Sequence, residues 1–201
     1  MLVIDTKLTP PEKEFLSQET EKGNRVWHVP ALEYRPTGIR VEISGFDAVF
    51  VASPRAAKLA KEALSEFEGP VLAAGPGTAR ALLQMGVPVA DAGSGNGAEK
   101  DFPQFLKMRR IHRVAWISAK QTAADLGAIA RENALAIEHF PVYETFPAQV
   151  DEKKMQSLEH PVEWHFYSGK GVLSLKRFVQ SNDVVHLHGD SAEKAFSASC
   201  R

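Results

Sequence analysis

Cysteine, long apolar runs and an excess of positive charge are all missing from this chain of 201 residues. Its single cysteine, Cys200, cannot form an internal disulfide, which is typical of a protein from a reducing compartment. No apolar run approaches the roughly 20 residues that a membrane-spanning helix needs. The opening residues carry neither a basic segment nor a long apolar core, so we expect no secretory signal. These absences predict a soluble, globular protein of the cytoplasm without a membrane partner.

The charge balance limits the ligands that the protein can hold. Lysine and arginine together number 24, and aspartate and glutamate 25, which gives a formal net charge of −1. Nucleic-acid-binding proteins depend on a basic surface to hold phosphates, so we expect no nucleic-acid partner. An anionic ligand would have to be held by local dipoles and by a few well-placed cations.

Strand-like apolar runs alternate with helix-like segments along the whole chain. The strand-like runs cover residues 2–5, 26–29, 49–52, 71–74, 87–90, 114–118, 137–142, 163–167 and 184–188. Segments with apolar residues every three or four positions cover 10–22, 54–67, 77–85, 98–108, 122–133 and 171–180, and another starts at Ser191. Residues 33–38, with one proline and one glycine, are typical of a connector. This alternation predicts an α/β fold with parallel sheets covered by helices on both faces.

The middle of the chain contains enough strands for a complete sheet, whereas neither end does. Five predicted strands fall between residues 46 and 142, and each end contributes two. We therefore predict two flavodoxin-like parallel-sheet lobes, one discontinuous (residues 1–33 and 147–201) and one inserted (residues 38–140). Residues 34–37 and 141–146 would form a two-stranded hinge. Such a long insertion is tolerable because the entropy of loop closure rises only with the logarithm of its length.

Both predicted lobes repeat a strand, a turn of small polar residues and a helix. Turns that open helices present unpaired N–H groups and hydroxyls, and ligands of open parallel sheets bind where strands end. Ordinary helix capping, worth about 1 kcal/mol, is the alternative role for each single residue. So many turns facing one edge favour a ligand with several negative charges, held between the lobes. The candidate substrate-binding residues are Ser53, Gly75, Gly77, Thr78, Ser168, Gly169, Gly189 and Ser191.

Two lysines and two histidines complete the list of polar candidates. Lys120 and Lys170 follow predicted strands and could pair with ligand carboxylates, although an exposed lysine is more often only solvated. His186 and His188 alternate along one strand, so their side chains share one face. A metal site would need a third ligand, which the local spacing does not provide. We therefore predict no metal site and treat both as core or edge histidines.

Short motifs along the chain resemble those of the uroporphyrinogen-III synthase family. They are FVASPRA (residues 50–56), AGPGTARAL (74–82) followed by Gly86, GNGAEK (95–100), VYET (142–145) and FYS (166–168). Each motif is weak alone, but their common order over about residues 46–192 makes the resemblance fairly specific. It implies two α/β lobes joined by a two-stranded ladder, a monomer, and no metal or cofactor.

The resemblance also implies an activity, that of a cyclising lyase of tetrapyrrole and heme biosynthesis. The expected substrate is hydroxymethylbilane, a linear tetrapyrrole polycarboxylate that loses its hydroxyl group and closes with its ring D inverted, giving uroporphyrinogen III. Tyr143 matches a tyrosine that the family places beside its cleft, which implies a hydrogen-bond donor to the departing hydroxyl. Packing of an aromatic ring against the hinge is the alternative role for Tyr143.

Two other functions stay open. One is a catalytically weak or silent relative that binds an anionic ligand, because Asp190 and Glu193 stand where the family has neutral residues and would repel a carboxylate. The other is a flavodoxin-like binding or signalling module. A dinucleotide enzyme is disfavoured because GPGTAR (residues 75–80) lacks the third glycine of the fingerprint.

Overall fold

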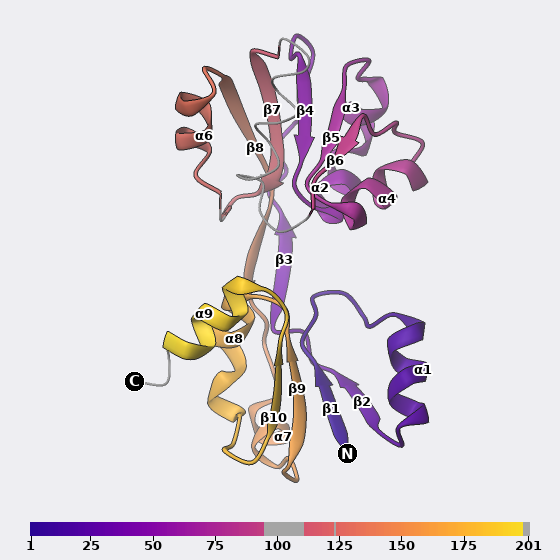
Figure 1. Ribbon diagram of the computed structural model, residues 1–201, viewed down its shortest axis with the longest axis vertical. Coiled ribbons are helices and arrows are strands. Elements are labelled where there is room, and N and C mark those ends of the chain that lie inside the picture. Colours follow the sequence, from indigo (N-terminus) through magenta and orange to yellow (C-terminus); the bar gives the residue numbers. More distant parts are fainter. Residues whose placement is uncertain (95–110, 123, 199–201) are drawn as a thin grey trace. The chain divides into compact units, whose positions relative to one another are not determined.

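The computed structural model describes residues 1–94, 111–122 and 124–198, and it divides into two compact units (Figure 1). Unit 1 comprises Met1–Glu33 and Phe146–Arg201, and unit 2 comprises Tyr34–Thr145. Each unit has its own sheet and its own apolar core. The helix predicted at 98–108 and the motif at 95–100 lie outside the described residues.

Unit 1 is built on a four-stranded sheet in the order β10-β9-β1-β2, and all three neighbouring pairs are parallel. Its strands are β1 (Leu2–Asp5), β2 (Arg25–His28), β9 (Val162–Phe166) and β10 (Val184–Leu187). Its helices are α1 (Lys13–Glu21), α7 (Glu152–Gln156), α8 (Gly169–Leu175), the short 3-10 helix η1 (Lys176–Phe178) and α9 (Asp190–Ala198). Leu2 lies opposite Val162, so strands from the two ends of the chain pair in one sheet.

Alternate residues of the unit 1 strands face two different environments. Ile4, Trp164 and Phe166 are completely buried on one face, where they pack with α8 and α9 residues such as Val172 and Ala192. The other face includes the buried, apolar Val3, but it carries most of the titratable side chains of these strands: Asp5, His28, Glu163, His165 and His186. The sheet of unit 1 therefore has one apolar face and one face rich in titratable side chains.

Unit 2 contains a six-stranded sheet in the order β3-β8-β7-β4-β5-β6, with parallel pairing from β8 through to β6. Its strands are β3 (Leu32–Pro36), β4 (Ala48–Val51), β5 (Val71–Ala73), β6 (Asp91–Ala92), β7 (Arg113–Ala119) and β8 (Ala136–Pro147). Its described helices are α2 (Pro54–Leu59), α3 (Lys61–Glu66), α4 (Pro76–Gln84) and α6 (Leu126–Glu132). The predicted class, α/β with parallel sheets, is confirmed.

The central strand of unit 2 shows why apolar runs predicted strands well here. Every residue of β4 is buried, but Val49 and Val51 belong to one apolar cluster and Ala48 and Phe50 to another. A strand covered on both faces reads as a continuous apolar run. The sheet is therefore packed on both sides, as the alternation of elements predicted.

The connector at 33–38 contains β3, which neighbours β8, and the Thr37 N–H donates to the Val142 carbonyl at 3.1 Å, as expected of a two-stranded hinge. One strand prediction is wrong. The strand predicted at 87–90 is absent, and β6 begins only at Asp91. Val87 is buried because the chain turns back at the end of α4 and packs this residue against the core. At that turn Gly86 has φ +81°, and the Val87 N–H donates to the Leu82 carbonyl.

Several helix boundaries also differ from the predictions. The helix expected at 54–67 is interrupted at Ala60, which separates α2 from α3. The helix expected from residue 122 starts at Leu126, where the Asp125 carboxylate caps it by accepting from the Ala128 N–H. The helix expected at 171–180 runs from Gly169 to Leu175 and continues as η1, and α7 is an additional short helix.

Candidate functional site

Strand order marks one candidate ligand-binding position in each unit. In unit 2, strands that follow β4 in the chain are added on one side of it (β5, β6), and later strands are added on its other side (β7, β8). The direction in which strands are added therefore reverses between β4 and β7. In unit 1 it reverses between β1 and β9. Ligands of open parallel sheets bind beyond the strand ends at such reversals. Ser53 and Lys120 follow the first pair of strands, and Thr6 and Ser168 follow the second.

Ser53 and Tyr143 meet at the reversal point of unit 2, although 90 positions separate them. The Ser53 Oγ caps α2 by accepting from the Ala56 N–H at 3.1 Å, and it lies 3.1 Å from the Tyr143 hydroxyl. The Tyr143 ring belongs to the apolar core and only 6% of the residue is exposed. Packing therefore fixes the ring, and the capping bond leaves the Ser53 proton free to point at the Tyr143 oxygen.

An arginine and a second tyrosine adjoin this pair. The Arg55 guanidinium carbon lies 4.2 Å from the Tyr34 ring centroid and 5.3 Å from that of Tyr143, and the two rings meet edge to face at 6.0 Å. We refer to Tyr34, Ser53, Arg55 and Tyr143 as the Tyr143 cluster. It combines one cation with three hydroxyl groups, which suits an oxygen-rich anionic ligand.

The sequence did not single out Arg55 or Tyr34 as functional. Arg55 was visible only as part of the motif at 50–56, and Tyr34 fell in residues expected to form a connector and hinge. The signal that could have found the cation is an arginine two residues after the serine that caps the first helix after β4.

Lys120, a predicted ligand contact, is engaged within unit 2. Its backbone N–H donates to the Tyr143 carbonyl at 2.7 Å, and its ammonium pairs with the Glu144 carboxylate. A little over half of the Lys120 side chain remains exposed. The lysine therefore supports the backbone of Tyr143, and binding a ligand carboxylate would require it to exchange partners.

The turn after β5 opens α4 and contains three predicted residues. Gly75 is the N-cap in an extended conformation, and a Cβ added to Gly77 would meet no atom within 4 Å. Thr78 is only 4% exposed, and its N–H donates to the Gly75 carbonyl. Space for a ligand therefore lies at Gly77, whereas the Thr78 side chain is largely enclosed.

Unit 1 repeats the serine cap but not the aromatic cluster. The Ser168 Oγ caps α8 by accepting from the Gly171 N–H at 3.1 Å, and Lys170 is exposed in the same turn. A Cβ on Gly169 would lie 2.7 Å from the Ser191 carbonyl oxygen and 3.3 Å from Ala195, so this glycine permits the close approach of α8 and α9. Gly189 precedes α9 with φ +96°, a conformation that favours glycine.

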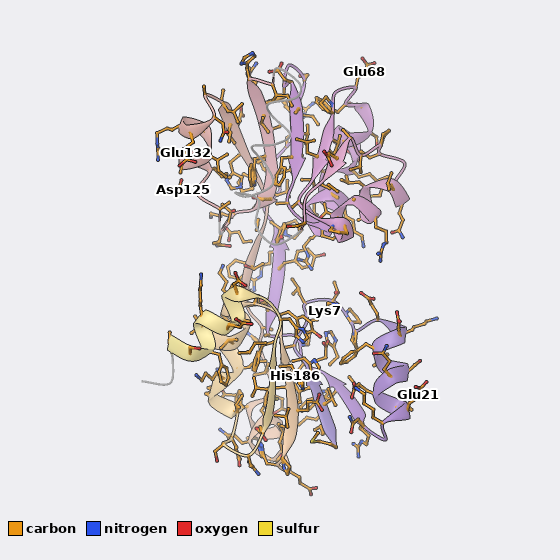
Figure 2. The ribbon with its side chains drawn as sticks, viewed as in Figure 1. Lys7, Glu21, Glu68, Asp125, Glu132 and His186 are labelled. Carbon is orange, nitrogen blue, oxygen red and sulfur yellow. The ribbon has the colours of Figure 1, made fainter. Side chains whose placement is uncertain are left out.

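The polar face of the unit 1 sheet carries a buried carboxylate at the reversal point. Asp5 ends β1 and is completely buried, and among the described residues its carboxylate accepts no hydrogen bond of normal geometry. Its ion-pair partner is the His28 Nε2, at 3.8 Å. Burial, and then the negative charge of Asp5, raise the pKa of the Tyr167 hydroxyl. Lys7, labelled in Figure 2, lies beside Tyr167, with its Nζ 5.3 Å from the ring centroid.

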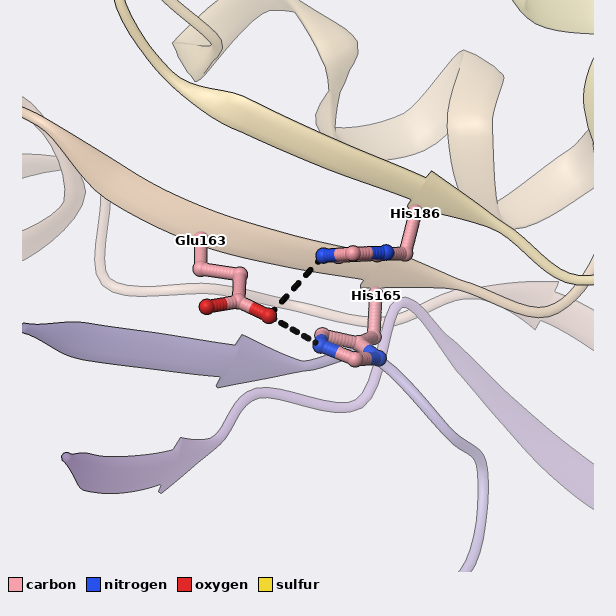
Figure 3. Close-up of side chains that lie close together, drawn as sticks. All are labelled: Glu163, His165 and His186. Atoms are coloured by element: carbon pink, nitrogen blue, oxygen red, sulfur yellow. Dashed lines mark hydrogen bonds and ion pairs between the residues drawn. The ribbon is translucent and has the colours of Figure 1, made fainter. Parts of the chain in front are cut away.

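Further along this face, Glu163, His165 and His186 form a compact group, shown in Figure 3. The Glu163 Oε1 lies 3.1 Å from the His165 Nε2 and 2.9 Å from the His186 Nε2. The local spacing indicated no third partner for His186, and the structure brings Glu163 and His165 beside it. The partners come from β9, which pairs with β10 only in the folded sheet.

The fold and the turns at its strand ends define a class: an α/β protein of two parallel-sheet units with anion-binding features in each. The family model described as uroporphyrinogen-III synthase HemD matches residues 14–198. The chain therefore belongs to the uroporphyrinogen-III synthase family.

Solved structures of similar fold agree with this assignment. The uroporphyrinogen-III synthetase of Helicobacter pylori matches with a TM-score of 0.70 and 13% identity, covering 98% of this chain and 88% of that one. A mutant uroporphyrinogen III synthase of Thermus thermophilus matches with a TM-score of 0.61 and 16% identity, at 98% and 88% coverage. No curated protein matches the chain.

Family membership supports the activity that the sequence resemblance implied. The family consists of cyclising lyases of porphyrin biosynthesis that act on a small-molecule tetrapyrrole, and no observation on the described residues favours a silent relative. In the described ranges, every helix is too short or too polar to cross a bilayer.

Proposed function

We propose that the chain converts hydroxymethylbilane to uroporphyrinogen III and that the Tyr143 cluster assists the departing hydroxyl. The observation that carries the proposal is the contact of 3.1 Å between the Tyr143 hydroxyl and the Ser53 Oγ, in a chain of this family. Ser53 accepts from the Ala56 N–H, and in this proposal its hydroxyl donates to the Tyr143 oxygen. The phenolic proton is then available to a substrate oxygen.

The charge of Arg55 complements this donor. Its guanidinium stacks on Tyr34, so it is held in place while its N–H groups remain able to pair with a carboxylate. A carboxylate on the guanidinium would orient the substrate with its leaving group toward Tyr143. Orientation is the main demand of this reaction, because the uninverted ring closure competes with the inverted one.

The remaining substrate carboxylates are assigned to the helix-opening turns of both units. These residues combine hydroxyls, backbone N–H groups and two lysines: Ser53, Gly75, Gly77, Thr78, Lys120, Ser168, Gly169, Lys170, Gly189 and Ser191. Open space at Gly77 and exposure of Lys170 support direct contact, whereas Gly169 contributes by allowing α9 to approach. Asp190 and Glu193, in the first turn of α9, would direct carboxylates away from that helix end.

A coupled assay with isomer analysis tests the activity. The purified chain is supplied with freshly formed hydroxymethylbilane, and the products are separated as oxidised porphyrin isomers. We expect the inverted isomer to predominate, whereas buffer alone gives the uninverted isomer. A product mixture identical to that of buffer alone would reject the synthase assignment and favour a silent relative.

We further infer that the protein acts as a cytoplasmic monomer without nucleic acid or membrane partners. The balanced charge and the lack of a long apolar helix among the described residues support this inference. Size-exclusion chromatography with light scattering tests the monomer: a mass near 22.1 kDa is expected, and twice that mass would contradict it.

A further inference from the structure

Three ligating atoms converge on the polar face of the unit 1 sheet, whereas the Tyr143 cluster belongs to unit 2. Glu163 and His165 alternate on β9 and so share a face, and His186 lies opposite His165 on the neighbouring strand β10. The three ligating atoms all lie within 4.8 Å of one another. Because the residues sit on paired strands rather than on loops, the sheet holds them in position before any ligand binds.

The spacing suits a tetrahedral metal ion. Zn²⁺ bonds of about 2.0–2.1 Å to histidine nitrogen and carboxylate oxygen place neighbouring ligand atoms about 3.3 Å apart. Glu163 Oε1 is 3.1 Å from the His165 Nε2 and 2.9 Å from the His186 Nε2. These two pairs need to separate by only a few tenths of an ångström. The His165 and His186 rings stack at 4.6 Å between centroids, so binding also requires the exposed His186 ring to turn toward the ion. Two imidazoles with one carboxylate are a donor set that suits Zn²⁺ and Co²⁺.

His188 orients the buried ligand. The His165 Nδ1 lies 3.1 Å from the His188 Nε2, and the two rings stack at 5.3 Å between centroids. On its other side His188 stacks on the Tyr167 ring at 4.4 Å. With a metal on Nε2, His165 carries its proton on Nδ1 and donates it to His188. A metal-bound histidine with its second nitrogen held in this way is the usual arrangement in metalloproteins.

The group is also accessible from one side. β10 is the edge strand of the sheet, and 44% of the His186 side chain is exposed, against 9% for His165 and 14% for Glu163. An ion can therefore enter past His186, and solvent can complete its coordination. The Glu163 carboxylate supplies the negative charge that two neutral imidazoles lack.

We propose that Glu163, His165 and His186 bind one Zn²⁺ ion through Oε1, Nε2 and Nε2, tying the edge strand β10 to β9. The site is independent of the synthase activity, because none of its three ligands belongs to the Tyr143 cluster. Its effect is to stabilise unit 1 when the ion is present.

Calorimetric titration of the untagged full chain with Zn²⁺ tests the site. We expect one ion per chain, and a rise in Tm of about 5–10 °C when free Zn²⁺ is about 100 times Kd. Co²⁺ should bind in the same place and give visible absorption bands. His186→Ala removes an exposed ligand with little risk to folding, and Glu163→Gln preserves side-chain shape. Both should weaken binding by more than about 100-fold, since even an outer-shell change costs about 10–100-fold.

His112→Ala is the matched control, because His112 is an exposed histidine of unit 2. It should bind Zn²⁺ as the unmodified chain does. Absence of Zn²⁺ binding by the unmodified chain would overturn the proposal. Equal binding by the Glu163, His186 and His112 variants would do so as well, because the ion would then lie elsewhere. Either result would leave the isomer assay, and so the proposed synthase activity, unaffected.

Discussion

Replacing Asp183 with asparagine should strongly destabilise unit 1. The Asp183 side chain is completely buried and accepts four hydrogen bonds. Its Oδ1 accepts from the His160 Nδ1 at 2.7 Å and the Val162 N–H at 2.9 Å. Its Oδ2 accepts from the Trp164 Nε1 at 3.0 Å and the Gln180 N–H at 2.8 Å. One carboxylate thus joins the turn before β10 to the start of β9.

The magnitude follows from the number of bonds lost. Asparagine keeps one acceptor oxygen, but its amide nitrogen would face two donors. Each hydrogen bond to a charged group contributes about 1.5–3 kcal/mol, so losing two predicts a decrease of about 3–6 kcal/mol in unfolding free energy. For a domain the size of unit 1, Tm should fall by at least about 10 °C. Asp151→Asn is the control, because Asp151 caps α7 and asparagine caps a helix equally well.

The pH dependence of stability gives a second measurement of the same interaction. Burial alone would raise the pKa of Asp183, but the hydrogen bonds that it accepts outweigh burial and hold that pKa below its usual range. A group whose folded pKa is lowered stabilises the protein above its unfolded pKa, which is about 3.9 for aspartate. The difference between the unmodified chain and Asp183→Asn should therefore shrink as the pH falls below about 4.

Urea denaturation followed by circular dichroism, at pH 7 and at several values down to pH 2, measures both effects. A loss of less than about 1 kcal/mol at pH 7 would refute the assignment of four strong bonds to Asp183. A difference that stays constant down to pH 2 would refute the charge-based explanation.

Three further predictions concern the candidate site and its support. Tyr143→Phe should lower kcat at least about tenfold with KM little changed and the product still inverted, since the phenol acts mainly in the transition state; unchanged kcat would exclude the donor role. Arg55→Gln should raise KM about tenfold in the same assay, the effect of losing one charge-assisted contact with a substrate carboxylate, and an unchanged KM would contradict that contact. Gly169→Ala should destabilise the chain by about 1–3 kcal/mol in urea, because its Cβ would meet the Ser191 carbonyl oxygen at 2.7 Å. Gly77→Ala, with open space around it, should cost nothing, and equal effects of the two substitutions would reject the packing role of Gly169.

Strands could be predicted wherever an apolar run is buried because it lies inside a sheet. The apolar run that became β4 is buried on both faces, and its short length and its valine and phenylalanine residues favour a strand over a buried helix. Val87 misled the prediction because it is buried by contact with the end of α4 rather than by strand pairing. The composition of β3, with a proline and charged residues, is typical of a connector, and its place beside β8 was expected only from the two-lobe arrangement, which requires a two-stranded hinge.

The candidate site was predictable only in part, for a related reason. Ser53 and Ser168 could be found because a serine between a strand and a helix is a local signal, and both cap their helices. The role of Arg55 in helix α2 could not be found, because it depends on contacts with Tyr34 and Tyr143, which lie on strands β3 and β8.

The sequence by itself determined the α/β class, the alternation of elements and the family, because each depends on order and periodicity along the chain. Only the tertiary structure decided which distant residues meet. It joined Ser53 to Tyr143 and brought Glu163 and His165 beside His186. It also gave Asp183 its four donors. The physical reason is that strand pairing fixes contacts between segments far apart in the chain, and no local pattern records which strands will be neighbours.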